Sequence, residues 1–216
     1  MLTAVCKQTA VTYEAVLSKI DASAAEIKLI SESQDPGLFG NNWASRVSKV
    51  YMALLKGSHL QIFLEQVSEL GVPEIIIWSA ERSIAKIEPK EAPSKLARWQ
   101  RIAESAAKQS GQVLVPKISF HPSLKEALLS HTNSEPHQIR LVCSLNPGAK
   151  PLKHFEVGPK DRFQFIIGPE GDFTPGEDAL ISQSSFLPVT LGPIRLRAEM
   201  AGIAAVISSH AVFGYF

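Results

Sequence analysis

The sequence predicts an α/β protein: a parallel sheet covered by helices, preceded by a smaller β-rich segment. Strand and helix patterns alternate from residue 48 onward, which is typical of a parallel sheet with crossover helices. The run "PEIIIWS" (73–79) is almost continuously apolar, as a strand buried on both faces requires. The first 31 residues contain only short strand patterns, and 216 residues suffice for one substantial core plus a small module.

The composition is that of an ordinary globular protein. It is 45% hydrophobic and 20% charged with a formal net charge of +1, so any surface for nucleic acid must be local. The two cysteines, Cys6 and Cys143, are too far apart in sequence to suggest a disulfide framework, and a reduced compartment is expected. No apolar run reaches the roughly 18 residues of a membrane span, and the first residues lack a signal-peptide pattern. We expect a soluble protein of the cytoplasm, or of an organelle matrix if a targeting segment is missing from this chain.

The N-terminal segment predicts a small β-module. The runs "LTAVCK" (2–7), "VTYEAVL" (11–17) and "EIKLIS" (26–31) read as strands, but three strands bury too little surface to be stable alone. Its other strands are therefore absent or come from elsewhere. Residues 31–46 are rich in Gly, Asn, Ser and Asp and are the linker candidate, which divides the chain into 1–46 and 47–216.

The α/β pattern begins with a strand at 48–55 and a helix within 56–71. Ser58 and Gln61 have capping-box spacing and Gly71 closes the helix. The later elements follow in order: strand 73–79, helix 94–111, a helix near 122–130, strands 139–144 and 162–167, a helix from about Pro175, strand 187–191, and a helix from about Arg197.

The strand at 162–167 leads directly into "GPEGDFTPGE" (168–177), which has two possible explanations. Thr174, Pro175 and Glu177 form a helix start by local rules alone, so the loop could be a plain turn. A phosphate cradle is excluded, because the dinucleotide and P-loop glycine patterns are missing and Glu170 and Asp172 would repel a phosphate. Two acids and an exposed backbone suit a neutral or cationic ligand better, such as a nucleoside with a positive sulfonium.

A second loop supports a ligand site. Strand 187–191 ends in Gly192-Pro193, and two such exits from parallel strands would meet at the carboxyl edge of the sheet, where open α/β sheets bind ligands. The helix that follows is rich in small residues from Ala198 to Ala205, which indicates either core packing or a subunit interface.

Together, "FIIGPEGDFTPGE" and "LPVTLGPIRLRAEMA" resemble the two C-terminal signatures of the RsmE-type ribosomal RNA uridine-N3 methyltransferases of the SPOUT superfamily. The blocks "ALLKGSHLQIFLEQVSELGVPEII", "ERSIAK" and "RWQRIAESAAKQSG" resemble the family's earlier blocks in the same order, so the resemblance covers about residues 48–210.

The resemblance implies an α/β domain with a trefoil knot, a homodimer, and S-adenosyl-L-methionine as cofactor. It implies methylation of uridine N3 in ribosomal RNA of the small subunit. A PUA-like β-barrel usually precedes this domain, so 1–46 is expected to be part of such a barrel. Carried over by position, the cofactor-binding candidates are Leu145, Ile167, Gly168, Pro169, Glu170, Gly171, Leu191, Gly192 and Leu196.

Arg197 and Glu199 are the catalytic candidates. N3 lies on the pairing edge of uracil, so the base must be unpaired or flipped out to react. The guanidinium of Arg197 could hydrogen-bond a uracil carbonyl and stabilise charge that develops after proton loss. An ion pair of Arg197 with Glu170 or Glu199 is the alternative, and orienting Arg197 is a better role for Glu199 than accepting the proton.

The candidates for RNA contact are Arg82, Lys86, Lys95, Arg98 and Arg101. A solvated helix face explains the last three equally well. The six histidines show no metal-ligand spacing, so no metal is expected.

Several positions depart from the family's pattern. Asp172 stands where a glycine is usual, which predicts that its loop adopts a positive φ less readily. Ile194-Arg195 reverses the family's usual Arg-Ile order, and Met200 replaces a common threonine. Gln66 and Gln112 stand at positions that are often occupied by basic residues. A catalytically weak RNA-binding or assembly protein, or a related methyltransferase acting on another RNA, therefore remains an alternative.

Overall fold

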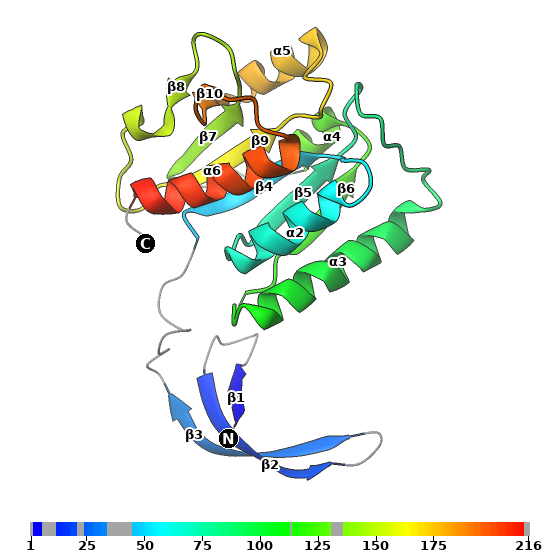
Figure 1. Cartoon of the computed structure of the whole chain (residues 1–216), viewed down its shortest axis with the longest axis vertical. Helices are drawn as coiled ribbons and strands as arrows, with labels where there is room; N and C mark the ends of the chain where they lie inside the picture. The colour runs from blue at the N-terminus through cyan, green and yellow to red at the C-terminus, as the bar shows by residue number, and fades with distance from the viewer. Residues whose placement is uncertain are drawn as a thin grey trace.

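The computed structural model describes residues 2–5, 12–20, 24–33, 45–112, 114–130 and 136–213. These residues form a three-stranded sheet and a seven-stranded sheet with helices (Figure 1). Cys6, His131 and most of the expected linker lie outside the described residues.

The elements follow the expected order with small differences at their ends. The strands are β1 (Leu2–Val5), β2 (Thr12–Ile20), β3 (Ala25–Ser33), β4 (Val47–Ala53), β5 (Glu74–Trp78), β6 (Lys117–His121), β7 (Gln138–Cys143), β8 (Lys150–Pro151), β9 (Arg162–Ile167) and β10 (Leu187–Thr190). The helices are α2 (His59–Glu69), α3 (Ala92–Gln109), α4 (Leu124–Leu129), the short 3-10 helix η1 (Leu152–His154), α5 (Pro175–Gln183) and α6 (Ala198–Val212).

The N-terminal sheet is antiparallel, in the order β1-β2-β3. Strands β2 and β3 leave many apolar side chains exposed: Val16, Leu17, Ile20, Ile27, Leu29 and Ile30. As the sequence predicts, three strands do not bury their own apolar surface.

The large sheet has the order β6-β5-β4-β9-β7-β10-β8, and every neighbouring pair is parallel. The prediction of a parallel α/β sheet is confirmed. The sequence reading missed β6, whose five residues "KISFH" alternate too briefly to stand out, and β8, which has only two residues.

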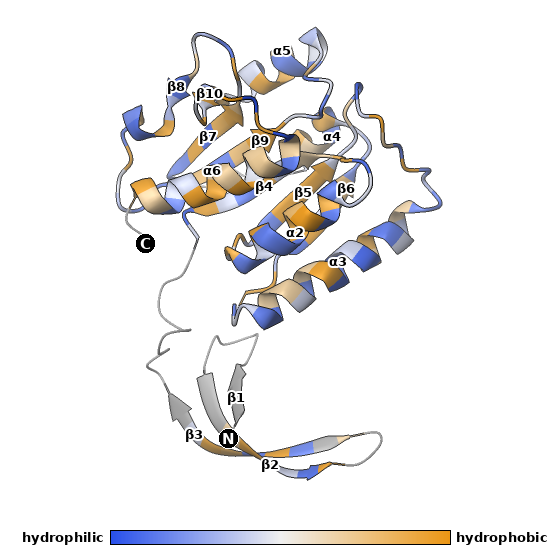
Figure 2. Cartoon of the chain, in the orientation of Figure 1, coloured by the Kyte–Doolittle hydropathy of each residue, from blue (hydrophilic) through white to orange (hydrophobic). Residues whose placement is uncertain are grey.

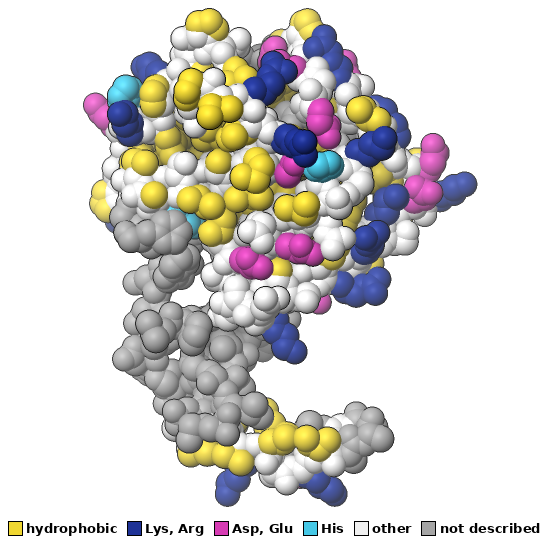
Figure 3. Space-filling model, viewed as in Figure 1, with side chains coloured by type: hydrophobic (Ala, Val, Ile, Leu, Met, Phe, Trp, Pro, Cys, Tyr) yellow, Lys and Arg dark blue, Asp and Glu magenta, His cyan; other side chains and the backbone are white. Residues whose placement is uncertain are grey.

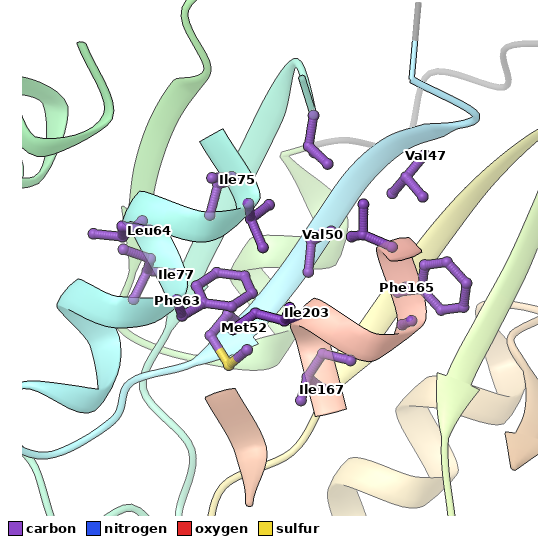
Figure 4. Close-up of a cluster of buried hydrophobic side chains, with 14 of the residues drawn as sticks. Val47, Val50, Met52, Phe63, Leu64, Ile75, Ile77, Phe165, Ile167 and Ile203 are labelled. Carbon is purple, nitrogen blue, oxygen red and sulfur yellow. The ribbon is translucent and has the colours of Figure 1, made fainter. Parts of the chain in front are cut away.

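Successive side chains of the central strands enter two different cores. In β4, Val50 and Met52 join a cluster with Phe63 of α2, whereas Tyr51 and Ala53 join a second cluster on the other face. Figure 2 shows hydrophobic residues concentrated along strands such as β5 and β7, and Figure 4 shows the first cluster around Met52, Phe63 and Ile203. This two-sided burial explains why these strands read as apolar runs.

Helices cover both faces of the sheet (Figure 1). Helices α2, α3 and α6 pack on the face of the first cluster, and α4 and α5 pack on the face of the second. In α3, Trp99 and Ala103 are buried while Arg98 and Arg101 are exposed, as the helical periodicity predicts.

The two expected capping boxes have different outcomes. Thr174 and Glu177 form one at the start of α5, each side chain accepting a hydrogen bond from the other residue's backbone N–H. The prediction for Ser58 is wrong: its backbone is already helical and its side chain makes no cap. Gln61 donates instead to Glu65 one turn further along α2.

Close packing inside the chain explains the small residue at the centre of α6. A Cβ added to Gly202 would lie 2.5 Å from the ring of Phe63 and 2.8 Å from the Met52 methyl. Gly202 and Ala205 are therefore core residues, and the helix lies directly on β4 and α2.

We predict that Gly202→Ala lowers the free energy of unfolding by about 1–3 kcal/mol, because the added methyl overpacks the core. Urea denaturation checks the prediction. The sign of the change in the free energy of unfolding is informative, since Gly→Ala in an uncrowded helix stabilises the protein by about 1 kcal/mol. Gly176→Ala in α5 is the matched control, because its added Cβ meets only Thr174 Oγ1 at 3.8 Å. Stabilisation by both substitutions would contradict the tight packing of α6.

Candidate functional site

Three loops leave the sheet at the same edge. Strands β9, β7 and β10 are adjacent and parallel, so the segments after their carboxyl ends, loops 168–174, 144–149 and 191–197, emerge together. The expected meeting of the two Gly-Pro exits at one edge is confirmed, with the loop after β7 between them. Loops at this edge of a parallel sheet are positioned to bind a ligand.

Loop 168–174 leaves the buried end of β9 and carries two exposed acids. Ile167 and Pro169 are buried, whereas Glu170 and Asp172 are exposed. Asp172 has φ 64°, so the expectation that it would resist a positive φ is wrong. Aspartate tolerates this conformation better than most residues, and its carboxylate accepts a hydrogen bond from the Phe173 N–H at 2.9 Å.

The end of this loop is anchored on two sides. The Phe173 ring stacks on Trp78 of β5, with ring centroids 6.3 Å apart and planes within 3°. Glu177 is 3% exposed. One of its carboxylate oxygens accepts from Thr174 N–H at 2.9 Å and the other from Glu81 N–H at 3.0 Å. Glu177 thus joins loop 168–174 to the segment that follows β5.

The structure places Arg82 against the same loop. Its Nη1 donates to the carbonyl of Phe173 at 2.9 Å and, less closely, to that of Gly171 at 3.4 Å. Gly171 permits this approach, since an added Cβ would lie 3.1 Å from both the Cβ and the carbonyl oxygen of Arg82. Lys86 donates to the carbonyls of Ala80 and Glu81 within its own segment.

Loop 191–197 has an open backbone. Gly192 has φ 130°, a conformation that other residues rarely adopt, and a Cβ placed there would have nothing within 4 Å. The Thr190 hydroxyl shapes the turn by accepting from the Gly192 N–H and donating to the Gly192 carbonyl. Leu191 and Leu196 are half-buried, and Arg197 is exposed at the first position before α6.

Loop 144–149 presents an apolar side chain beside an inert thiol. Leu145 is 51% exposed, whereas desolvation raises the pKa of the Cys143 thiol to about 12. A thiol with such a pKa remains protonated at neutral pH, so Cys143 is not a nucleophile.

Glu199 interacts with a residue that the sequence did not single out. It is 6% exposed, and its Oε1 lies 2.8 Å from Nδ1 of His59 in the first turn of α2. Among the described residues, neither Glu199 nor Glu170 forms an ion pair with Arg197, so the alternative of such a pair is not observed. Glu199 ties the start of α6 to the start of α2.

The basic residues predicted to contact RNA fall into two groups. Arg82 and Lys86 follow β5, whereas Arg98 and Arg101 line a groove of about 790 Å³ between α2 and α3 together with Glu65 and Glu69. The ammonium nitrogen of Lys95 lies 3.8 Å from a carboxylate oxygen of Glu91, the residue that precedes α3. None of the three loops lines this groove. The structure therefore does not bring all of the basic residues together with the expected cofactor-binding residues.

Among the described residues there is no cluster of three or more His, Cys, Asp or Glu side chains that could hold a metal ion. None of the helices in these ranges combines the length and the apolar character of a membrane span.

Sequence reasoning missed His59 and the second role of Glu177. His59 lies in a block that resembles the family, but nothing local in that block indicates a partner 140 residues away. Glu177 was recognised as a capping residue, but its bond to Glu81 depends on the order of strands in the sheet. Gln112, noted for its departure from a basic position, donates to the carbonyl of Glu69 and closes the end of α2.

Comparison with known protein families shows the family to which this chain belongs. Residues 44–209 match the model of a family described as the RNA methyltransferase domain, which is more than half of the chain. The chain belongs to this RNA methyltransferase family.

Within this family, the chain is similar to enzymes that are named as small-subunit ribosomal RNA methyltransferases. The chain is 32% identical over 155 residues to ribosomal RNA small subunit methyltransferase E 2 of Borreliella burgdorferi, covering 70% of this chain and 60% of the relative. It is 30% identical over 164 residues to ribosomal RNA small subunit methyltransferase E of Mesomycoplasma hyopneumoniae, covering 76% of this chain and 69% of the relative. These relatives confirm the resemblance to RsmE-type enzymes. Against several relatives the alignment spans less than two thirds of the longer protein, as with 64% for Bacillus subtilis.

Solved structures agree. A ribosomal RNA small subunit methyltransferase E from Neisseria gonorrhoeae, bound to S-adenosyl methionine, superposes with a TM-score of 0.78 at 28% identity, covering 94% of this chain and 79% of that chain. A methyltransferase from Legionella pneumophila, in complex with the same cofactor, has a TM-score of 0.78 at 25% identity, again covering 94% and 79%. A TrmH/SpoU tRNA modifying enzyme of Aquifex aeolicus shares the fold at a TM-score of 0.50 and 14% identity, covering 76% of this chain and 75% of that chain. The SPOUT fold class is confirmed.

We predict that Asp172→Gly and Asp172→Asn keep the stability of the protein within about 0.5 kcal/mol, because both residues accept a positive φ. Asp172→Val should cost about 1–2 kcal/mol more, since a β-branched residue is strained in that conformation. Urea denaturation of the three variants checks this order. Equal stability of the valine and glycine variants would show that position 172 imposes no backbone constraint.

Proposed function

We propose that the protein transfers a methyl group from S-adenosyl-L-methionine to N3 of a uridine in ribosomal RNA of the small subunit. The observation that supports this most is the convergence of loops 144–149, 168–174 and 191–197 at one sheet edge, in a chain of the RNA methyltransferase family. The proposed location is the cytoplasm, or an organelle matrix if the natural chain carries a targeting segment.

The residues of the three loops fit this cofactor. The open space at Gly192 lets a ligand approach the backbone, and Leu145, Leu191 and Leu196 offer apolar contacts for an adenine ring. Exposed Glu170 and Asp172 favour a cationic sulfonium and amine over a phosphate. The proposed cofactor contacts are therefore those expected from the motifs, from Leu145 and Ile167 through Gly168, Pro169, Glu170 and Gly171 to Leu191, Gly192 and Leu196.

When bound, S-adenosylmethionine supplies a methyl group that is already activated for transfer. The protein must hold uracil N3 in line with that group and assist loss of the imide proton. Exposed Arg197, at the end of loop 191–197, is the proposed substrate contact, because its guanidinium can donate to a uracil carbonyl on which negative charge develops. Glu199, held by His59, fixes the first turn of α6 next to Arg197.

Contact with RNA is proposed for two regions. Arg98 and Arg101 are exposed on α3, and Lys86 is exposed near the loops. Such cations bind phosphates and dominate nucleic-acid affinity. Residues 1–46 are proposed to be part of a PUA-like barrel that helps to hold the RNA, with 47–216 as the catalytic domain.

A homodimer is proposed from the surface of α6. Hydrophobic side chains gather over this helix (Figure 3), and Met200, Ile207 and Val212 are each exposed by more than 40%. An apolar helix surface next to the proposed site is suited to a second copy of the chain.

The first experiment is transfer of labelled methyl groups from S-adenosylmethionine to small ribosomal subunits, with the product mapped by a reverse-transcription stop. We predict a stop at one uridine, because a methyl on N3 blocks pairing. Arg197→Ala should lower kcat about 100-fold or more, as loss of a donor to developing charge does, and change the dissociation constant of the cofactor by less than about threefold.

The outcomes separate the alternatives. Cofactor binding without transfer to any RNA would favour an RNA-binding or assembly protein. Methylation of another RNA would favour a related methyltransferase. If Arg197→Ala loses methyl transfer and cofactor binding to the same extent, Arg197 contacts the cofactor and not the substrate.

We predict that Ile207→Glu converts a dimer into a monomer, because it places a charge in the centre of an apolar interface. Light scattering after size exclusion measures the mass. Leu129→Glu on α4 is the matched control, since Leu129 is also exposed, at 60%, but lies on a helix that packs on the opposite face of the sheet. Dissociation by the control alone, or a monomeric wild type, would contradict this interface.

A further inference from the structure

The segment that follows β5, residues 80–86, packs directly on loop 168–174 and is here named the support segment. It is itself fixed to the sheet edge: Ser83 is 5% exposed, its hydroxyl donates to the carbonyl of Leu54 at 3.1 Å, and its N–H donates to Ala80. The Leu54 N–H in turn donates to Trp78 at 2.7 Å. The support segment is therefore a fixed part of the fold and not a free loop.

Hydrogen bonds run from donors of the support segment to loop 168–174 and to the first turn of α5. Arg82 donates to the carbonyls of Phe173 and Gly171, and Glu177 accepts from the Glu81 N–H. Glu177 is nearly fully buried, so losing one of its partners would leave a buried acceptor unsatisfied. The contact is also close in space, because a Cβ added to Gly171 would lie 3.1 Å from both the Cβ and the carbonyl oxygen of Arg82.

Charge gives Arg82 a second effect, on the start of α5. Burial is the main cause that raises the pKa of the Asp178 carboxyl; the charges of Asp172 and Glu177 raise it further, and the charge of Arg82 lowers it. The cation of Arg82 thus favours the ionised form of Asp178 in the first turn of α5.

We propose that Arg82 is a positioning residue: together with Glu177, it holds loop 168–174 in the shape that binds S-adenosylmethionine. The inference rests on the proposed function for the identity of the ligand. It gives Arg82 a role different from the RNA contact expected from its charge. The bonds of its guanidinium within the described residues run to backbone carbonyls of the loop.

The test compares Arg82→Ala and Arg82→Lys with Arg98→Ala. Arg98 is the matched control, because it is also an exposed arginine but bonds to Gln61 between α2 and α3. Isothermal titration calorimetry without RNA gives the dissociation constant for S-adenosylmethionine. Hydrogen exchange of the cofactor-free proteins gives the protection of the amides of residues 171–174. A filter-binding assay with small-subunit RNA gives the RNA affinity.

We expect Arg82→Ala to weaken cofactor binding roughly tenfold, as loss of charge-assisted hydrogen bonds does, and to speed exchange in residues 171–174. Arg82→Lys should be intermediate, because an ammonium lacks the fork of a guanidinium. Guanidinium ion at millimolar concentration should partly restore binding to Arg82→Ala, whereas urea at the same concentration should not. Arg98→Ala should leave cofactor binding and exchange within twofold of wild type.

Thermal unfolding of each variant shows whether it is folded. If Arg82→Ala unfolds below room temperature, Arg82→Lys with the same measurements decides. Unchanged cofactor binding together with weakened RNA binding would overturn the proposal and make Arg82 an RNA contact. A wild type that binds no S-adenosylmethionine would refute the proposed function itself. If instead the wild type and Arg82→Ala bind S-adenosylmethionine equally well, only the positioning role of Arg82 is refuted.

Discussion

Parallel alignment of the seven strands is the constraint on which the site depends. Because β4, β9, β7 and β10 all run in one direction, every segment that follows their carboxyl ends emerges at a single edge. The same alignment requires helices on both faces and gives two cores, with Met52 and Tyr51 as neighbours in sequence on opposite sides. A side chain at this edge is therefore placed by residues far from it in the chain.

Buried carboxylates link two of the helix starts at this edge to neighbouring parts of the chain. Glu177 connects α5 to the segment after β5, and Glu199 connects α6 to His59 of α2. Both carboxylates lie in the first turn of their helices, where the backbone N–H groups and the helix dipole favour negative charge. Such links fix the loops before the helices, which is what precise placement of a cofactor and a base requires.

Local rules account for much of this fold. The apolar runs of β4, β5 and β9, the periodicity of α3 around Trp99, and the cap at Thr174 each depend on residues close in sequence, and each is confirmed. The failures have equally physical causes. Ser58 has the right neighbours for a cap, but its backbone continues the helix, and β8 is too short to show a period. Asp172 reaches a positive φ because its own carboxylate satisfies the next amide.

The candidate site was accessible from the sequence through its motifs, whereas its supports were not. Gly168, Gly192 and Arg197 could be placed in two loops because the order of residues carries the resemblance. Arg82 and His59 depend on which strands are neighbours, and that information appears only when β5, β4 and β9 are assembled.

Loop 168–174 is held by the Trp78 ring, by the guanidinium of Arg82 and, through the Glu177 carboxylate, by the Glu81 amide, all of which come from a different part of the chain than the loop itself. This arrangement has a consequence for protein engineering. The glycine-containing stretch is not a portable module, because grafting it onto another sheet would transfer its sequence without the contacts that fix its conformation. A functional transplant would have to include the strand β5 and the residues that follow it as a second, non-contiguous piece.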